Sequence, residues 1–140
     1  MSVKFIEIKP DEIDVKSSFA RAAEFHGRGP FLAIGLRMGL LALRELNSLG
    51  HDGLEAIVET GTAPPLSCLI DGVQVANGCT LGKGNIRVRD GHRPRARFIA
   101  QSGKQVTIEL REEWAERFTH GDPEALAEEV LKLEDEELFR

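Results

Sequence analysis

The residues of this chain that could carry chemistry are concentrated in one short stretch, from Cys68 to Asn85. The stretch holds both cysteines of the 140-residue chain, together with Asp71, Gln74 and a glycine-rich turn. Thiols, carboxylates and amides are groups that ligate metal ions, attack substrates or move protons. Their concentration in one stretch predicts a functional site.

A helix that begins near Ser67 would place Cys68, Asp71 and Gln74 on one slanting polar stripe, because side chains three or four residues apart share a helix face. A thiol in the first turn lies at the positive end of the helix dipole, which favours the thiolate and therefore metal ligation or nucleophilic reactivity. Free cysteines are equally often small, buried core residues. Both interpretations of Cys68 stay open at this point.

The elements that must position this stretch form a mixed α and β domain without repeats. Hydrophobic periodicity and the glycine and proline positions predict where each element begins and ends. Helices are predicted at residues 13–25, 31–49 and 66–76, strands at 54–60, 85–89, 95–100 and 105–110, and acidic helices at 112–118 and 123–138.

The predicted helix 31–49 is the most hydrophobic segment of the chain and should be buried on most sides. Pro30 suits its first turn, and Gly50 is placed to end it in the left-handed conformation. Gly35 and Gly39 each cost roughly 1 kcal/mol relative to alanine within a helix. The compensation we expect is close approach of another backbone, either within the subunit or across a symmetric subunit contact.

Length and composition indicate one domain spanning residues 1–140, because 140 residues with 41% hydrophobic content match an ordinary globular domain. No run approaches the roughly 18 apolar residues of a membrane span, and the charged N-terminus lacks the apolar centre of a secretory signal. We therefore expect a cytoplasmic protein that engages no membrane. Its two cysteines are expected as thiols, ligands or core residues rather than as a structural disulfide.

Charge is unevenly distributed along the chain, whose net charge is −5. Residues 83–97 hold six basic residues and one acid, whereas residues 109–140 hold twelve acids and four bases. The basic cluster fits either an anion or nucleic-acid face or the solvated side of a strand, since its arginines alternate with apolar residues. We favour the solvated strand and expect no nucleic-acid partner, because the acidic tail can neutralise the cluster and no aromatic residues stand ready to stack on bases.

Four blocks of sequence, in order, resemble the formylmethanofuran dehydrogenase FmdE family. The resemblance runs from about residue 25 to 110 and implies an α+β fold in which a helix, a strand, a second helix and three strands form a mixed sheet. It implies a family core at about 19–110 without the C-terminal zinc ribbon of longer members, an acidic helical extension at about 111–140, and a homodimer. The blocks are Phe25-His26-Gly27, Gly35-Leu36-Arg37-Met38-Gly39, Cys68 to Gln74, and Gly78 to Asn85.

The resemblance also implies a metal site. Family members bind a transition metal, zinc first among the candidates, near a histidine-containing turn and the cysteines. Matched residue by residue, the implied ligands are His26, Cys68 and Cys79. The family turn has a second histidine where this chain has Arg28, and an arginine side chain cannot ligate a metal. The site is therefore expected to be weakened, rebuilt around an anion, or lost.

Helix geometry restricts which of these groups could share one ion. An unbroken helix between Cys68 and Cys79 would separate their backbones by about 16 Å, whereas two sulfurs on one zinc each lie about 2.3 Å from it. His26 with Cys68 is the more economical pair, with Asp71 or water completing the shell; Cys79 acts across a dimer interface or is structural. The hypothesis requires His26 and Cys68 to line one pocket. A hydrogen-bonded turn histidine is the alternative for His26.

Three functions are compatible with this pattern. We favour a metal-binding accessory protein of one-carbon or redox metabolism that performs no chemical step. The second is a small metal-dependent enzyme in which Asp71 is the general base and Arg28, Gln74 and Lys83 bind a small anionic substrate. The third is a degenerate, metal-free dimeric member of the family.

Overall fold

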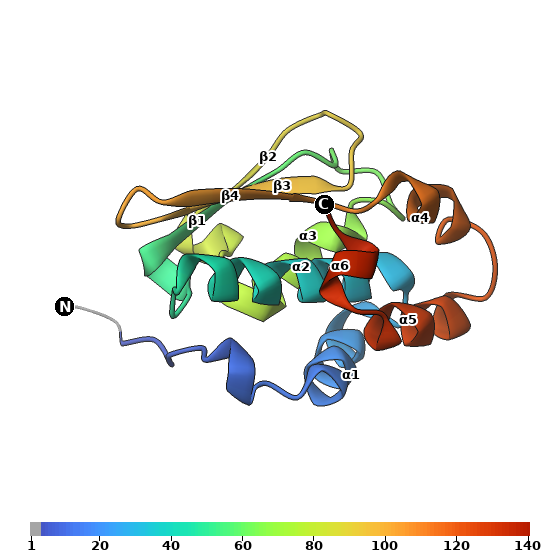
Figure 1. Ribbon diagram of the computed structural model, residues 1–140, viewed down its shortest axis with the longest axis horizontal. Helices are drawn as coiled ribbons and strands as arrows, with labels where there is room; N and C mark the ends of the chain where they lie inside the picture. The colour runs from blue at the N-terminus through green and yellow to red at the C-terminus, as the bar shows by residue number, and fades with distance from the viewer. Residues whose placement is uncertain (1–3) are drawn as a thin grey trace.

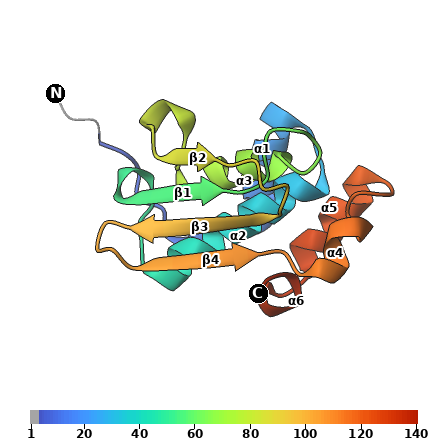
Figure 2. The ribbon, with the colours of Figure 1, turned by 90° about the horizontal axis from the view of Figure 1, so that it is seen from above.

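The computed structural model describes residues 4–140 as a four-stranded sheet with helices packed against one face (Figure 1). The strand order is β2–β1–β3–β4 (Figure 2). Strands β1 and β2 are parallel and the other pairs antiparallel, so the α+β fold with a mixed sheet is confirmed. The elements are α1 (Val15–His26), α2 (Pro30–Leu46), β1 (Leu54–Val58), α3 (Cys68–Asn77), β2 (Ile86–Val88), β3 (Arg95–Ala100), β4 (Gln105–Glu109), α4 (Glu112–Arg117), α5 (Pro123–Lys132) and α6 (Asp135–Leu138).

Helices α2 and α3 lie side by side beneath the sheet, and α1 packs on both of them (Figure 1). Their backbones touch through glycines: a Cβ on Gly35 would overlap the carbonyl of Leu69, and a Cβ on Gly72 would overlap the carbonyl of Leu32. The close approach predicted for the glycines of α2 is therefore made within the subunit. It fixes the position of α3, the helix that carries Cys68.

The end of α2 differs from the sequence prediction. Pro30 is its first residue, as expected, but the helix ends at Leu46 rather than near residue 49. Asn47 takes the left-handed conformation (φ 50°), which asparagine tolerates better than most residues, and thus terminates the helix. Gly50 was the wrong residue for this role: it has φ 82° and ψ −163° and lies in the following connection.

Residues 123–138 form two helices where one was predicted. Leu133 is extended (ψ 151°) and separates α5 from α6. A new N-cap at Glu134, whose capping box with Glu137 satisfies backbone donors at the start of α6, makes this interruption stable. The predicted N-cap of α5 is confirmed, since the side chain of Asp122 accepts a hydrogen bond from the backbone N–H of Ala125 at 3.0 Å.

Arginines of the basic cluster are paired with glutamates of neighbouring strands. This agrees with the solvated strand expected for the cluster, although the opposing charges come from β1, from Glu59 directly after it, and from β4, rather than from the acidic helices. The pairs are Arg87 with Glu55, Arg95 with Glu59, and Arg93 with Glu109.

None of the helices within residues 4–140 has the length and hydrophobicity needed to cross a lipid bilayer.

Candidate functional site

The turn between α1 and α2 is shaped by its glycines. Gly27 has φ 103°, a conformation that L side chains rarely adopt, and its N–H bonds to the carbonyl of Ala23 at 2.7 Å. The chain therefore leaves α1 directly after His26 and enters α2 at Pro30. This geometry turns the imidazole of His26 toward α3.

His26 is paired with Asp71 of α3. Its Nε2 lies 3.0 Å from Oδ2 of Asp71, and its Nδ1 lies 3.2 Å from the carbonyl oxygen of Gly27. A carbonyl and a carboxylate only accept hydrogen bonds, so a ring that carries one N–H donates to one of these two groups and not to both. Gln74 donates to the other carboxylate oxygen of Asp71 at 3.4 Å and accepts from the N–H of Leu81 at 3.2 Å. The pair thus links the turn, α3 and the following loop.

His26 and Cys68 line one pocket, as the hypothesis required. The pocket has a volume of about 140 Å³ and lies where the turn meets the first residue of α3. The rest of its wall is mostly apolar, so the site offers few polar groups to an occupant. The main apolar contributors are Pro30, Phe31, Pro65, Phe118 and Leu126.

Part of this wall was missed by the sequence prediction. Phe118 and Leu126 belong to the C-terminal segment, which was treated as an extension outside the family core. The available signal was that Trp114 and Phe118 are large apolar residues four positions apart in a polar segment, and Phe118 is fully buried in the structure. Such a residue in a polar segment indicates docking onto the core.

The thiol of Cys68 is half-buried at the start of α3. Burial, and secondarily the negative charge of Asp71, raises its pKa. The raised pKa disfavours nucleophilic attack by a thiolate, whereas metal ligation, in which the ion itself would remove the thiol proton, stays a prediction. The helix dipole does not overcome the loss of hydration, because stabilisation of a thiolate by a dipole is modest when the group is withdrawn from water.

Cys79 lies beyond the opposite end of α3 and is fully buried. Its thiol donates to the carbonyl of Leu54 at 3.6 Å, and burial raises its pKa to about 12. Helix α3 is unbroken from Cys68 to Asn77, which separates the two thiols by on the order of 15 Å. Cys79 therefore cannot share an ion with Cys68, and its buried thiol is not placed to reach a second subunit. The geometry supports the structural role for this residue.

The three side chains predicted to hold an anion do not converge. Arg28 points toward α5, where its Nε lies 3.1 Å from Glu124. Lys83 donates to the hydroxyl of Thr80 at 3.2 Å. Gln74 alone lies beside the His26–Asp71 pair. Arg28 thus has an electrostatic partner of its own, and a small anionic ligand bound by all three groups stays a prediction.

The donors at this corner match zinc in type and fall short in number. Imidazole, thiolate and carboxylate are all zinc ligands, and structural zinc sites use four of them. Within residues 4–140, no three His, Cys, Asp or Glu side chains gather as a metal-binding group. The corner made by His26, Asp71 and Cys68, called the His26 corner below, is therefore not a complete zinc site in one subunit.

Comparison with known proteins identifies the family. A family model described as "FmdE, Molybdenum formylmethanofuran dehydrogenase operon" matches residues 25–140, which is most of the chain. The chain belongs to the FmdE family. The match includes both the His26 corner and the C-terminal helices that help to enclose the pocket.

This FmdE-family chain is similar in sequence to one curated protein and in fold to one solved structure, among others. It is 47% identical over 102 residues to an Archaeoglobus fulgidus protein named "Probable S-adenosyl-L-methionine-binding protein", a match covering 67% of this chain and 24% of that protein. The chain thus spans about a quarter of the length of that curated relative. A crystal structure of a tungsten formylmethanofuran dehydrogenase FmdE-like protein from Syntrophus aciditrophicus has the same fold, with a TM-score of 0.72 and 23% identity over 97% of this chain and 74% of the other.

Proposed function

We propose that this FmdE-family chain is a non-catalytic accessory protein of one-carbon or redox metabolism that acts by binding at the His26 corner. The observation that carries the proposal is the His26–Asp71 pair, 3.0 Å apart, at an apolar pocket that Cys68 also lines. A carboxylate that holds one nitrogen of an imidazole is the arrangement that commonly orients a metal-binding histidine. This arrangement supports a binding role for the His26 corner.

The same observations argue against an enzyme. Asp71, the predicted general base, already accepts hydrogen bonds from His26 and Gln74. The raised pKa of Cys68 leaves little thiolate at neutral pH, so nucleophilic attack by this residue is disfavoured. The cations predicted to hold an anionic substrate lie apart. Zinc binding also needs the thiolate of Cys68, but a bound zinc ion would itself remove the thiol proton, whereas nucleophilic attack has no such help.

A transition metal, zinc first, is the ligand we propose for the corner. One subunit offers His26 and Cys68, with Asp71 or water as a further ligand, so the remaining positions would come from water, a second subunit of a homodimer or a partner protein. We therefore propose that zinc binds the isolated chain more weakly than it binds a structural centre, for which binding supplies about 10–16 kcal/mol.

Competition of the purified chain with a chromophoric zinc chelator tests this proposal. We expect one weak zinc site per chain, with affinity reduced at least about ten-fold in His26→Ala and in Cys68→Ser, a loss typical of disturbed metal sites. Cys79→Ala is the matched control and should bind zinc as the unaltered chain does. Absence of zinc binding, or binding that persists in both His26→Ala and Cys68→Ser, would refute the role given to the corner.

We do not propose S-adenosyl-L-methionine as the ligand of the His26 corner, although the name of one relative mentions it. The segment shared with the Archaeoglobus fulgidus relative makes up 24% of that protein, so its name does not assign the ligand to this segment. The pocket at the His26 corner, at about 140 Å³, is also small beside the roughly 300–1,000 Å³ of typical small-molecule sites.

A further inference from the structure

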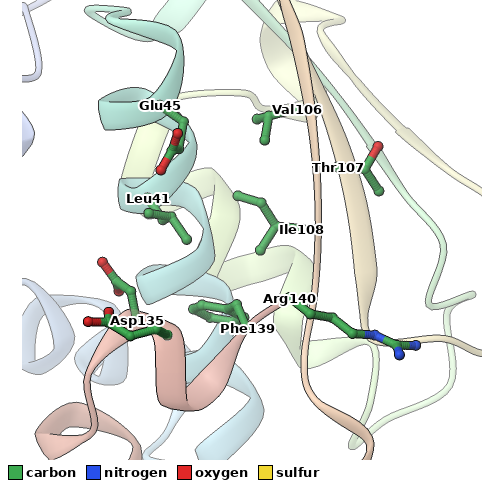
Figure 3. A pocket seen from close by; sticks show the side chains of 9 residues that line it. Leu41, Glu45, Val106, Thr107, Ile108, Asp135, Phe139 and Arg140 are labelled. Carbon is green, nitrogen blue, oxygen red and sulfur yellow. The ribbon is translucent and has the colours of Figure 1, made fainter.

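A second hollow lies far from the His26 corner, between α2 and the outer strand of the sheet, β4. Figure 3 shows it as a gap with Leu41 and Glu45 on the helix side and Val106 and Ile108 on the strand side. Its volume is about 260 Å³. Phe139, which follows α6, closes one end (Figure 3).

At the end closed by Phe139, the C-terminal residues already pair with the end of β4 as a short strand would. Phe139 bridges to Leu110 in the antiparallel sense, and Glu109 and Arg140 exchange both backbone hydrogen bonds, at 3.1 and 2.9 Å. The chain around Phe139 therefore begins a fifth strand along β4. Its phenyl ring is buried, which shows what kind of side chain the hollow accepts.

The rest of this edge continues the same hydrogen-bonding row. Backbone groups of successive residues point to opposite sides of a strand, and those of Glu109 point outward, to Arg140. The backbone N–H and C=O groups of Thr107 and Gln105 consequently point outward as well. Strand β4 is last in the sheet order, and in the described part of the chain no strand pairs with it beyond Glu109.

We propose that this edge of β4 is a docking site for an extended peptide segment of a partner protein, which adds to the sheet antiparallel to β4. The pairing begun by Arg140 sets the register, so alternate side chains of the peptide would enter the hollow beside Val106 and Ile108, as Phe139 does. Beside Ile108 and Phe139 the entering side chain is apolar, because the walls that it meets there are apolar.

The charges that line the hollow select the other hollow-facing side chains of the peptide. Glu45 and Glu136 line the hollow, are exposed, and have no ion pair among residues 4–140. Asp135 also lines it and is shared between Arg37 and Arg44. The partner segment is therefore one whose hollow-facing positions combine apolar residues with lysine or arginine, since these complement Glu45 and Glu136.

Nuclear magnetic resonance of the ¹⁵N-labelled chain with a short capped peptide that carries valines and lysines at its hollow-facing positions tests the proposal. We expect shifts confined to β4 and the hollow, and exchange of the Gln105 amide slowed by about ten-fold or more. Thr107→Pro removes an outward N–H at an edge position, where proline is tolerated, and should abolish this protection. Thr107→Ala keeps the N–H and should bind as the unaltered chain does.

Two modified peptides complete the test. The same peptide with N-methylated backbone amides on the bonding side should not bind, and replacement of its lysines by glutamate should weaken binding at least several-fold. Equal binding of the N-methylated peptide, or no binding of the parent peptide at millimolar concentration, would overturn the proposal. Self-association of the chain that Thr107→Pro abolishes would overturn it too, because the occupant would then be a second copy.

Discussion

Cys79 is kept as a neutral thiol by the core around it, since burial raises its pKa from the ordinary value of 9.0 to about 12. In the unfolded chain the thiol ionises near pH 9, so between about pH 9 and 12 the unfolded state binds fewer protons than the folded state. The stabilisation linked to this thiol is present below about pH 9 and is lost as the pH rises toward 12.

This difference predicts how stability varies with alkaline pH. The free energy of unfolding should fall by up to about 1.4 kcal/mol per pH unit above pH 9 because of Cys79. Urea unfolding at a series of pH values measures the slope. Cys79→Ala lacks the titrating group and should show a shallower decline; equal slopes for the two proteins would contradict the environment assigned to this thiol.

The sequence was sufficient to single out His26, Cys68 and Asp71, and insufficient to decide their protonation or partners. The spacing of Cys68 and Asp71 follows from the helix they share. Their distance from His26 depends on how α1 packs against α3, which no local pattern encodes. Arg28 is the clearest case: its partner Glu124 is nearly a hundred residues away in sequence, so its orientation toward α5 was not predictable.

Helix α2 packs against α1, α3 and α5, and its glycines make the closest of the contacts with α3. Gly35 touches the backbone of Leu69 with no space for a methyl group. Gly35→Ala should therefore destabilise the fold by about 1–3 kcal/mol, although alanine is the better helix former, because overlap with a backbone carbonyl cannot be relieved by a rotamer change.

Chemical unfolding of Gly35→Ala beside Gly82→Ala checks this prediction. Gly82 has open space around it and an ordinary backbone conformation, so its substitution should change stability by no more than about 0.5 kcal/mol. If Gly35→Ala were as stable as Gly82→Ala, the backbone contact between α2 and α3 would be disproved.

The polar edge of α2 anchors the C-terminal helices. Arg37 is 10% exposed and donates to the carbonyl of Val130 at 2.8 Å and to Asp135 at 3.0 Å. Arg37→Met should cost about 2–3 kcal/mol, because it leaves a half-buried carboxylate and a carbonyl with fewer donors. Arg44 also meets Asp135, but it is 45% exposed, so Arg44→Met should cost less than about 1 kcal/mol.

Comparison of the urea unfolding of these two variants tests the anchoring role. If Arg44→Met lowered the free energy of unfolding as much as Arg37→Met does, burial would not distinguish the two contacts. The sequence predicted that α2 is buried on most sides. It could not predict the break between α5 and α6, because the extended conformation of Leu133 is stabilised by the capping box that follows and by docking of Leu138 and Phe139 onto the core.

At the scale of the whole molecule, the order of helices and strands was predictable and the closure of the site was not. Hydrophobic periodicity located the strands and the main helices to within a few residues, because burial of one face determines it. The pocket at the His26 corner also needs Phe118 and Leu126, which reach it only through the tertiary fold. The comparisons place the chain in the FmdE family.

Anomalous scattering at the zinc edge, from crystals grown with zinc, tests the central claim most directly. We predict one peak per subunit within bonding distance, about 2.0–2.3 Å, of the ring of His26 and the sulfur of Cys68, with any further ligand coming from Asp71, water or another chain. A peak at Cys79, or a zinc ion that touches neither His26 nor Cys68, would contradict the binding role proposed for this corner.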